Sequence, residues 1–115
     1  MDGIGTALPY LAGMNTIVET KAFTRSAVEF WTLDEYEDFK VFIVMNPDAG
    51  VIVPGSGGLR KIRWRNQGTG KRGGTRVIYY NRKKYETWLL AIYSKSDMEN
   101  LTKAEIRSLR RVVDE

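Results

Sequence analysis

Three cationic side chains alternate with apolar ones in the segment from Leu59 to Arg65. Lys61, Arg63 and Arg65 occupy every second position, so in an extended strand all three point to the same face. Like charges at this spacing repel one another, so stability alone does not favour the pattern. Because rows of arginine and lysine bind phosphate oxygens well, the segment is a candidate phosphate-binding strand.

A second expected strand, residues 75–80, and the hairpin before it extend this basic surface. The strand places Arg76 on the same face as Ile78 and Tyr80. The hairpin carries Lys71 and Arg72 on a glycine-rich loop, whose backbone can approach a phosphate closely. Together the two strands and the hairpin predict a curved cationic surface.

Charge is strongly separated along the chain. Residues 50–84 include ten basic and no acidic side chains, whereas the rest holds eight basic and fourteen acidic ones, for a net charge of +4. This separation predicts a polyanionic partner. Further candidates for contacting it are Arg60, Arg82, Lys83 and Lys84. The alternative is a solvated basic sheet face, balanced by an acidic helix that carries Asp34, Glu35, Glu37 and Asp38.

Several chemistries do not fit the composition. The chain has no histidine and no cysteine, which removes hydrolase triads, thiol chemistry and most zinc or iron sites. The segment Gly70–Arg72 lacks the Ser or Thr that follows the lysine of a nucleotide-binding P-loop. The acidic helix has an apolar opposite side, which favours a solvated face over a metal cluster. We therefore expect no cofactor and no metal.

The length of 115 residues predicts one domain. Residues 15–20 are expected as a strand and 24–31 as a short helix with Ala27, Phe30 and Trp31 on one side. A second helix begins at a capping box, Thr32 with Glu35, and ends at Asn46–Pro47. Its apolar stripe is Tyr36, Phe39, Phe42 and Ile43. Residues 51–58, with Pro54 and three glycines, are expected as a loop.

The second half predicts a sheet followed by a helix. Strands are expected at 59–65, 75–80 and 86–93. A second capping box, Thr102 with Glu105, begins a final helix. Its apolar stripe is Ile106, Leu109, Val112 and Val113. The order predicts an α+β fold: an N-terminal strand, two helices, a three-strand antiparallel meander and a C-terminal helix. Residues 1–13 are expected to be a poorly ordered extension of a domain spanning 14–115.

The expected compartment is the cytoplasm. The absence of cysteine gives no sign of a secreted, disulfide-bonded protein. No apolar run reaches the length of a membrane span, and the N-terminus lacks the basic region of a signal peptide. We therefore expect neither export nor contact with a membrane.

Four segments carry a resemblance to a known family. They are NPDAG at 46–50, PGSGGLRKIRW at 54–64, GTGKRGGTRVIYY at 68–80 and LLAIYSKSDMENLT at 89–102. In this order and spacing they resemble the HigB-like branch of the RelE superfamily, bacterial toxins of type II toxin–antitoxin pairs. The resemblance covers essentially residues 14–113.

The resemblance implies an activity and partners. It implies a RelE-like domain that enters the ribosomal A site and cleaves messenger RNA there without a metal. It also implies inhibition by a cognate antitoxin, often with a helix-turn-helix domain, through which operator DNA would be bound. Lys61 and Arg63 resemble the family's cationic strand positions, and Arg76 resembles the arginine near the scissile phosphate. Ser96 follows Lys95 where the best-described members have arginine, and Thr102 lies near the place of a family tyrosine.

These departures leave the acid and base open. RNA cleavage by its own 2′-hydroxyl needs a base for that proton, neutralisation of the charge on the phosphorane and a proton for the leaving 5′-oxygen. Arg63 and Arg76 suit charge neutralisation, because they stay protonated and offer planar donors. Either Lys61 or Lys95 is a candidate base. Tyr93 is a candidate for stacking on a base or donating a proton, or is simply a partly buried strand residue.

Two alternatives use the same surface. One is a non-catalytic RNA-binding regulator that grips phosphates without cleavage. The other is a toxin-fold protein that has lost activity and serves mainly as its antitoxin's partner. Growth arrest on expression distinguishes the active toxin from both.

Overall fold

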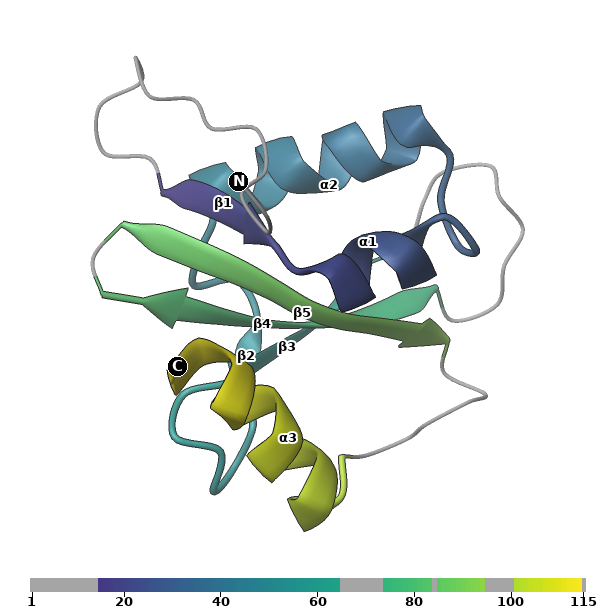
Figure 1. Cartoon of the computed structure of the whole chain (residues 1–115). Helices are drawn as coiled ribbons and strands as arrows, with labels where there is room; N and C mark the ends of the chain where they lie inside the picture. Colours follow the sequence, from purple (N-terminus) through teal and green to yellow (C-terminus); the bar gives the residue numbers. More distant parts are fainter. Residues whose placement is uncertain (1–14, 65–73, 84, 95–100, 115) are drawn as a thin grey trace.

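A computed structural model describes residues 15–64, 74–83, 85–94 and 101–114. The chain forms one five-stranded sheet with helices on both sides (Figure 1). The elements in chain order are β1 (Thr16–Glu19), α1 (Lys21–Ala27), α2 (Leu33–Met45), β2 (Val51–Ile52), β3 (Arg60–Trp64), β4 (Thr75–Arg82), β5 (Glu86–Ser94) and α3 (Lys103–Asp114). The expected extension at residues 1–13 lies outside the described residues.

The sheet order is β1-β5-β4-β3-β2. Strands β3, β4 and β5 form the expected antiparallel meander, and β1 adds to β5 in parallel. Helices α1 and α2 lie on one side of the sheet and α3 on the other (Figure 1). The prediction of a mostly antiparallel α+β fold is therefore confirmed.

Side-chain caps determine where the helices begin. Helix α1 starts at Lys21, three residues earlier than expected, because the Thr20 hydroxyl accepts the Phe23 backbone N–H at 3.2 Å. The capping box expected at Thr32 is present: Thr32 N donates to Glu35 Oε1 at 2.8 Å, and Glu35 N donates to Thr32 Oγ1 at 3.2 Å. Phe30 and Trp31 follow α1 and still pack against the core.

The segment after α2 corrects one prediction. Residues Val51 and Ile52, expected in a loop, form the edge strand β2 and pair with Lys61 and Arg60. Gly50 allows this approach, because a Cβ there would lie 2.8 Å from Tyr79 Cε1. Its backbone N–H donates to the Tyr79 hydroxyl at 2.8 Å. A two-residue strand is set by its neighbours in the sheet, so local composition does not reveal it.

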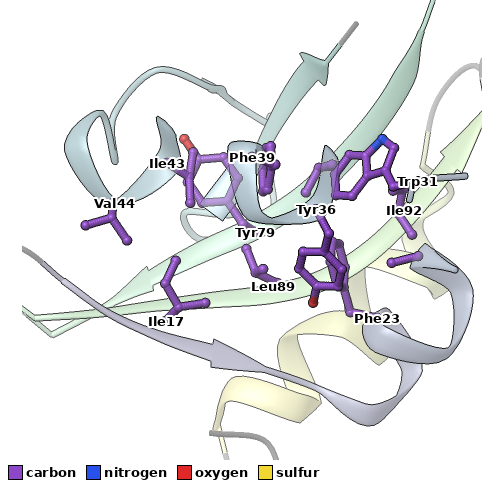
Figure 2. Close-up of a cluster of buried hydrophobic side chains, with 12 residues drawn as sticks. Ile17, Phe23, Trp31, Tyr36, Phe39, Ile43, Val44, Tyr79, Leu89 and Ile92 are labelled. Carbon is purple, nitrogen blue, oxygen red and sulfur yellow. The ribbon is translucent and has the colours of Figure 1, made fainter. Parts of the chain in front are cut away.

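The larger core lies between the sheet and the helices α1 and α2. Aromatic rings meet there edge to face, with centroids 5.7 Å apart for Phe23–Tyr36 and for Trp31–Tyr36. Figure 2 shows this cluster, to which the sheet contributes Ile17, Tyr79, Leu89 and Ile92. The expected α2 stripe is confirmed, with Tyr36, Phe39 and Ile43 buried and Phe42 partly exposed.

A smaller core lies under α3. The buried members are Leu59, Ile78, Leu90, Tyr93 and Val113. The second capping box is present, with Thr102 N donating to Glu105 Oε1 at 2.7 Å and Glu105 N to Thr102 Oγ1 at 3.1 Å. Val112, expected in the stripe, is exposed. Only Val113 in the last turn of α3 is buried, while Leu101, Ile106 and Leu109 are partly exposed.

Candidate functional site

Strand register brings three predicted cations to one face of the sheet. Arg63 lies directly opposite Arg76, and Lys61 lies two residues along β3, opposite Ile78. Their neighbours Ile62 and Trp64 point the other way, into the larger core. Lys61, Arg63 and Arg76, which we call the cation row, therefore share the α3 side of the sheet.

The cation row combines a buried and an exposed guanidinium. Arg76 is 9% exposed, whereas Arg63 is exposed. Like charges on directly opposite residues destabilise a sheet. Among the residues described, neither Lys61 nor Arg63 makes an ion pair. The acidic helix α2 lies across the sheet, so it does not cover these cations (Figure 1). A bound polyanion would relieve the repulsion.

Tyr93 lies beside the cation row, on the neighbouring strand β5. It lies directly opposite Arg76 and is 7% exposed, and its buried hydroxyl has no hydrogen-bond partner within the described part of the chain. Burial raises the pKa of Tyr93, Arg76 opposes this shift and Glu105 adds to it. Tyr93 is therefore a neutral phenol at physiological pH.

Glu105 is a neighbour of this site that sequence reasoning missed. It acts on Tyr93 electrostatically, and the two side chains line one hollow between β5 and α3. The sequence marked it as half of a capping box, and that role is real. A local signature cannot show that the capping carboxylate also faces a strand tyrosine twelve residues earlier.

Two hollows flank the first half of α3. One, of about 260 Å³, lies between β5 and α3 and is lined by Ala91, Tyr93, Leu101, Ala104, Glu105, Ser108 and Leu109. The other, of about 270 Å³, lies beside β2 and is lined by Val51, Ile52, Val53, Pro54, Lys61, Leu101 and Ile106. The first hollow adjoins the cation row through Tyr93, which lies opposite Arg76, and the second through Lys61, a member of the row.

Other predicted cations lie apart from the row. Arg60 is on the opposite face, bonded to Gly50 O at 2.7 Å and paired with Asp48 at 3.4 Å. Arg82 is at the far end of β4, 3.6 Å from Glu86 and stacked over Trp88 at 5.4 Å. Lys83 is exposed in the turn between β4 and β5, with φ of 58°. The structure therefore does not bring these three residues to the cation row.

The remaining predicted site residues lie outside the described residues. They are Arg65, Lys71, Arg72, Lys84 and Lys95. Within the described ranges there is no group of three or more acidic side chains that could hold a metal ion. In the same ranges no helix has the length and apolar character of a membrane span.

Comparisons with known proteins identify the fold and the family. The structure is similar to that of a mutant of the E. coli toxin RelE in the free state, with a TM-score of 0.58 and 13% sequence identity. The match covers 86% of this chain and 98% of that chain, which shows a shared fold. A family model described as "RelE toxin of RelE / RelB toxin-antitoxin system" matches residues 46–115, more than half of the chain. The protein therefore belongs to the RelE family of toxins.

Proposed function

We propose that this protein is a ribosome-dependent messenger RNA endoribonuclease of the HigB-like branch, the toxin of a type II toxin–antitoxin pair. The observation that carries the proposal is the cation row with Tyr93 beside it. Arg63, Arg76 and Tyr93 lie directly opposite one another on three adjacent strands, so two guanidinium side chains and a neutral phenol are neighbours on one face of the sheet. Family membership gives the class of protein, and the cation row supports the proposed chemistry.

The row fits cleavage of RNA by its own 2′-hydroxyl. The 2′-oxygen attacks phosphorus as its proton passes to a base, the bond from phosphorus to the 5′-oxygen breaks, and that oxygen takes up a proton. The products are a 2′,3′-cyclic phosphate and a 5′-hydroxyl. Arg63 and Arg76 stabilise the charge on the phosphorane. The neutral phenol of Tyr93 is the proton donor or the surface on which a base stacks.

Lys61 is the candidate base within the described residues, and Lys95 is the second candidate. Lys61 is partly buried and lies two residues from Arg63 on the same face of β3. A site with such limited acid–base equipment gains most of its rate when RNA is already held in line for attack. We therefore propose messenger in the ribosomal A site as the substrate, with no metal or cofactor.

Partners and location follow from the same proposal. A cognate antitoxin, with a helix-turn-helix domain, would silence the toxin and carry the complex to operator DNA. The toxin itself would work in the cytoplasm, without contact with a membrane. Expression of the chain alone should arrest bacterial growth, and co-expression with the product of an adjacent reading frame should restore it.

The direct test is cleavage of one messenger, either on translating ribosomes or free, by the purified protein. We expect cleavage on ribosomes and almost none of free RNA. Arg63→Gln and Arg76→Gln should each reduce the rate about a hundredfold or more, because each removes a donor that stabilises transition-state charge. Arg25→Gln is the matched control, since Arg25 is an exposed arginine of α1 on the other side of the sheet.

Arg63→Gln is the variant that decides the test, because Arg76→Gln could also affect folding. Because Arg76 is nearly buried, Arg76→Gln is compared with the wild type by circular dichroism and thermal unfolding before its rate is interpreted. Arg63 is exposed, so its substitution leaves packing intact. Equal cleavage of free and ribosome-bound RNA, or full activity of Arg63→Gln, would overturn the proposal. Binding of RNA without cleavage products would establish the non-catalytic regulator instead.

A further inference from the structure

The hollow of about 260 Å³ between β5 and α3 arises from small side chains on both walls. Ala91 on the strand and Ala104 on the helix leave space that larger residues would fill. The helix is held at its far end, where Val113 is buried, while Leu101 just before the helix and Ile106 in its first turn are only partly buried. Ala104 and Ser108 are exposed, so they form the mouth, and nearly buried Tyr93 forms part of the floor.

The lining has the character of a small ligand site. It is mostly apolar, with an aromatic ring at Tyr93 and two polar side chains, Glu105 and Ser108. Ligand pockets commonly combine apolar walls with a few polar groups that fix orientation. Drug-sized ligands occupy pockets of about 300–1,000 Å³, so this volume suits a single planar ring system.

The position of the hollow connects it to the cation row. Tyr93 lies directly opposite Arg76, so the hollow begins one strand away from the guanidinium pair. A nucleotide whose phosphate lies on Arg63 and Arg76 has its base one sugar away. Proteins that read single-stranded RNA splay out a base, stack it on an aromatic side chain and bond its edge.

We propose that this hollow binds one nucleobase of the RNA, and that Glu105 selects a base with an exocyclic amino group. The inference rests on the proposed function and names a specificity-determining residue for it. A carboxylate only accepts hydrogen bonds, so it pairs with the amino groups of cytosine, adenine or guanine. Uracil presents carbonyl oxygens on both sides of its single N–H, and these repel a carboxylate.

Glu105 can do this while it caps α3. The capping bond from Thr102 N uses one carboxylate oxygen, Oε1, at 2.7 Å. A carboxylate accepts about four hydrogen bonds, so acceptor capacity remains for a base. Glu105→Gln preserves the cap, because glutamine serves the same capping-box position. It adds a donor that can pair with a uracil carbonyl, so it separates selection of the base from support of the helix.

The first test measures binding without cleavage. We expect CMP, AMP and GMP to shift the methyl NMR signals of Ala91, Ala104 and Leu109, and UMP to bind about tenfold more weakly. Ala104→Leu should abolish these shifts by filling the hollow. Ala22→Leu is the matched control, an exposed alanine of α1 across the sheet. Absence of shifts at these methyl groups, or equal affinity for all four nucleotides, would overturn the inference.

The second test sequences the RNA ends produced on ribosomes. Wild-type protein should cut next to amino-bearing bases, and Glu105→Gln should accept uracil there while it keeps its thermal stability. If the wild type cleaves but the Glu105→Gln profile is unchanged, the inference fails and the proposed function stands. If nucleotides bind in the hollow but no messenger is cleaved, the proposed function fails and the base site stands.

Discussion

On the side of α1 and α2, the sheet is covered by interlocking aromatic rings, whereas on the side of α3 it carries cations, two hollows and a small apolar cluster. The first face holds Phe23, Phe39 and Tyr79 with no exposed surface. The second keeps Arg63 exposed directly opposite another arginine. The comparison teaches that one face supplies the stability that lets the other tolerate unfavourable charge.

Truncating the aromatic core should have the largest effect. Phe39→Ala removes a fully buried ring, whose centroid lies 5.1 Å from the ring centroid of Trp31 and 5.2 Å from that of Trp64. We expect the free energy of unfolding to fall by about 3–5 kcal/mol, measured by urea denaturation. Leu109→Ala on the α3 face should cost much less, because Leu109 is partly exposed. Equal losses would show that the two faces contribute equally to stability.

Removing one hydroxyl should have the next largest effect. The Tyr79 hydroxyl accepts from Gly50 N and donates to Pro47 O, both at 2.8 Å. Tyr79→Phe leaves the buried Gly50 N–H without this partner, so we expect a loss of about 1–3 kcal/mol in urea denaturation. Tyr85→Phe, at an exposed tyrosine, is the control and should be neutral. A neutral Tyr79→Phe would show that this bond adds nothing.

The two capping boxes offer a matched pair. Thr32→Ala should lower the free energy of unfolding by about 1 kcal/mol, because α2 packs along the larger core. Thr102→Ala should lower it less, because the first turn of α3 is only partly buried. Its effect should instead be local, as faster amide hydrogen exchange at residues 103–106. Equal global losses with no local change would contradict the difference between the faces.

Removing a charge from the cation row should have the opposite sign. Arg63→Gln relieves repulsion between directly opposite arginines, so we expect a gain of about 0.2–1 kcal/mol in stability. The gain should shrink as salt is raised, because ions screen exposed charges. Arg25→Gln should show no such gain. A loss of stability in Arg63→Gln would mean that the row is compensated within the protein.

Alkaline pH should lower the stability of the fold, whereas neutral pH should not. Burial is the main cause that raises the pKa of Tyr36, Tyr79 and Tyr93 in the folded protein. Below about pH 10 these phenols are neutral in both states, and above it the unfolded chain loses protons that the folded protein keeps. Stability should therefore fall as pH rises above 10. Tyr36→Phe should weaken this dependence; an unchanged pH profile would contradict the shift.

Local signals allowed much of the fold to be predicted. The capping boxes at Thr32 and Thr102 are formed by residues three apart, so sequence alone marks them. Strand alternation likewise placed Lys61 and Arg63 on one face, and the register adds that Arg63 meets Arg76. The start of α1 was missed because a threonine stands at both position 20 and position 24, and either could begin a helix. In the structure Thr20 forms the cap.

The features that the sequence could not predict depend on contacts between residues far apart in the chain. The edge strand β2 exists because Val51 and Ile52 meet Lys61 and Arg60 across the sheet. Arg60 was grouped with the other cations by charge, although strand alternation puts it on the face opposite Lys61 and Arg63; what sequence could not show is its bond to Gly50 O and its ion pair with Asp48. Glu105 became a site candidate only when α3 was placed beside Tyr93.

The parallel pairing of β1 with β5 also bears on how the chain is made. Thr16 aligns with Glu86, and the Thr16 N–H donates to Tyr85 O at 2.6 Å. Strand β1 therefore cannot pair in the sheet until β5 has been synthesised. Closure across so many residues is slow compared with local contacts. During synthesis, Arg63 and Arg76 emerge before Tyr93 can join them. The side-by-side arrangement of Arg63, Arg76 and Tyr93 is therefore complete only after β5 has emerged.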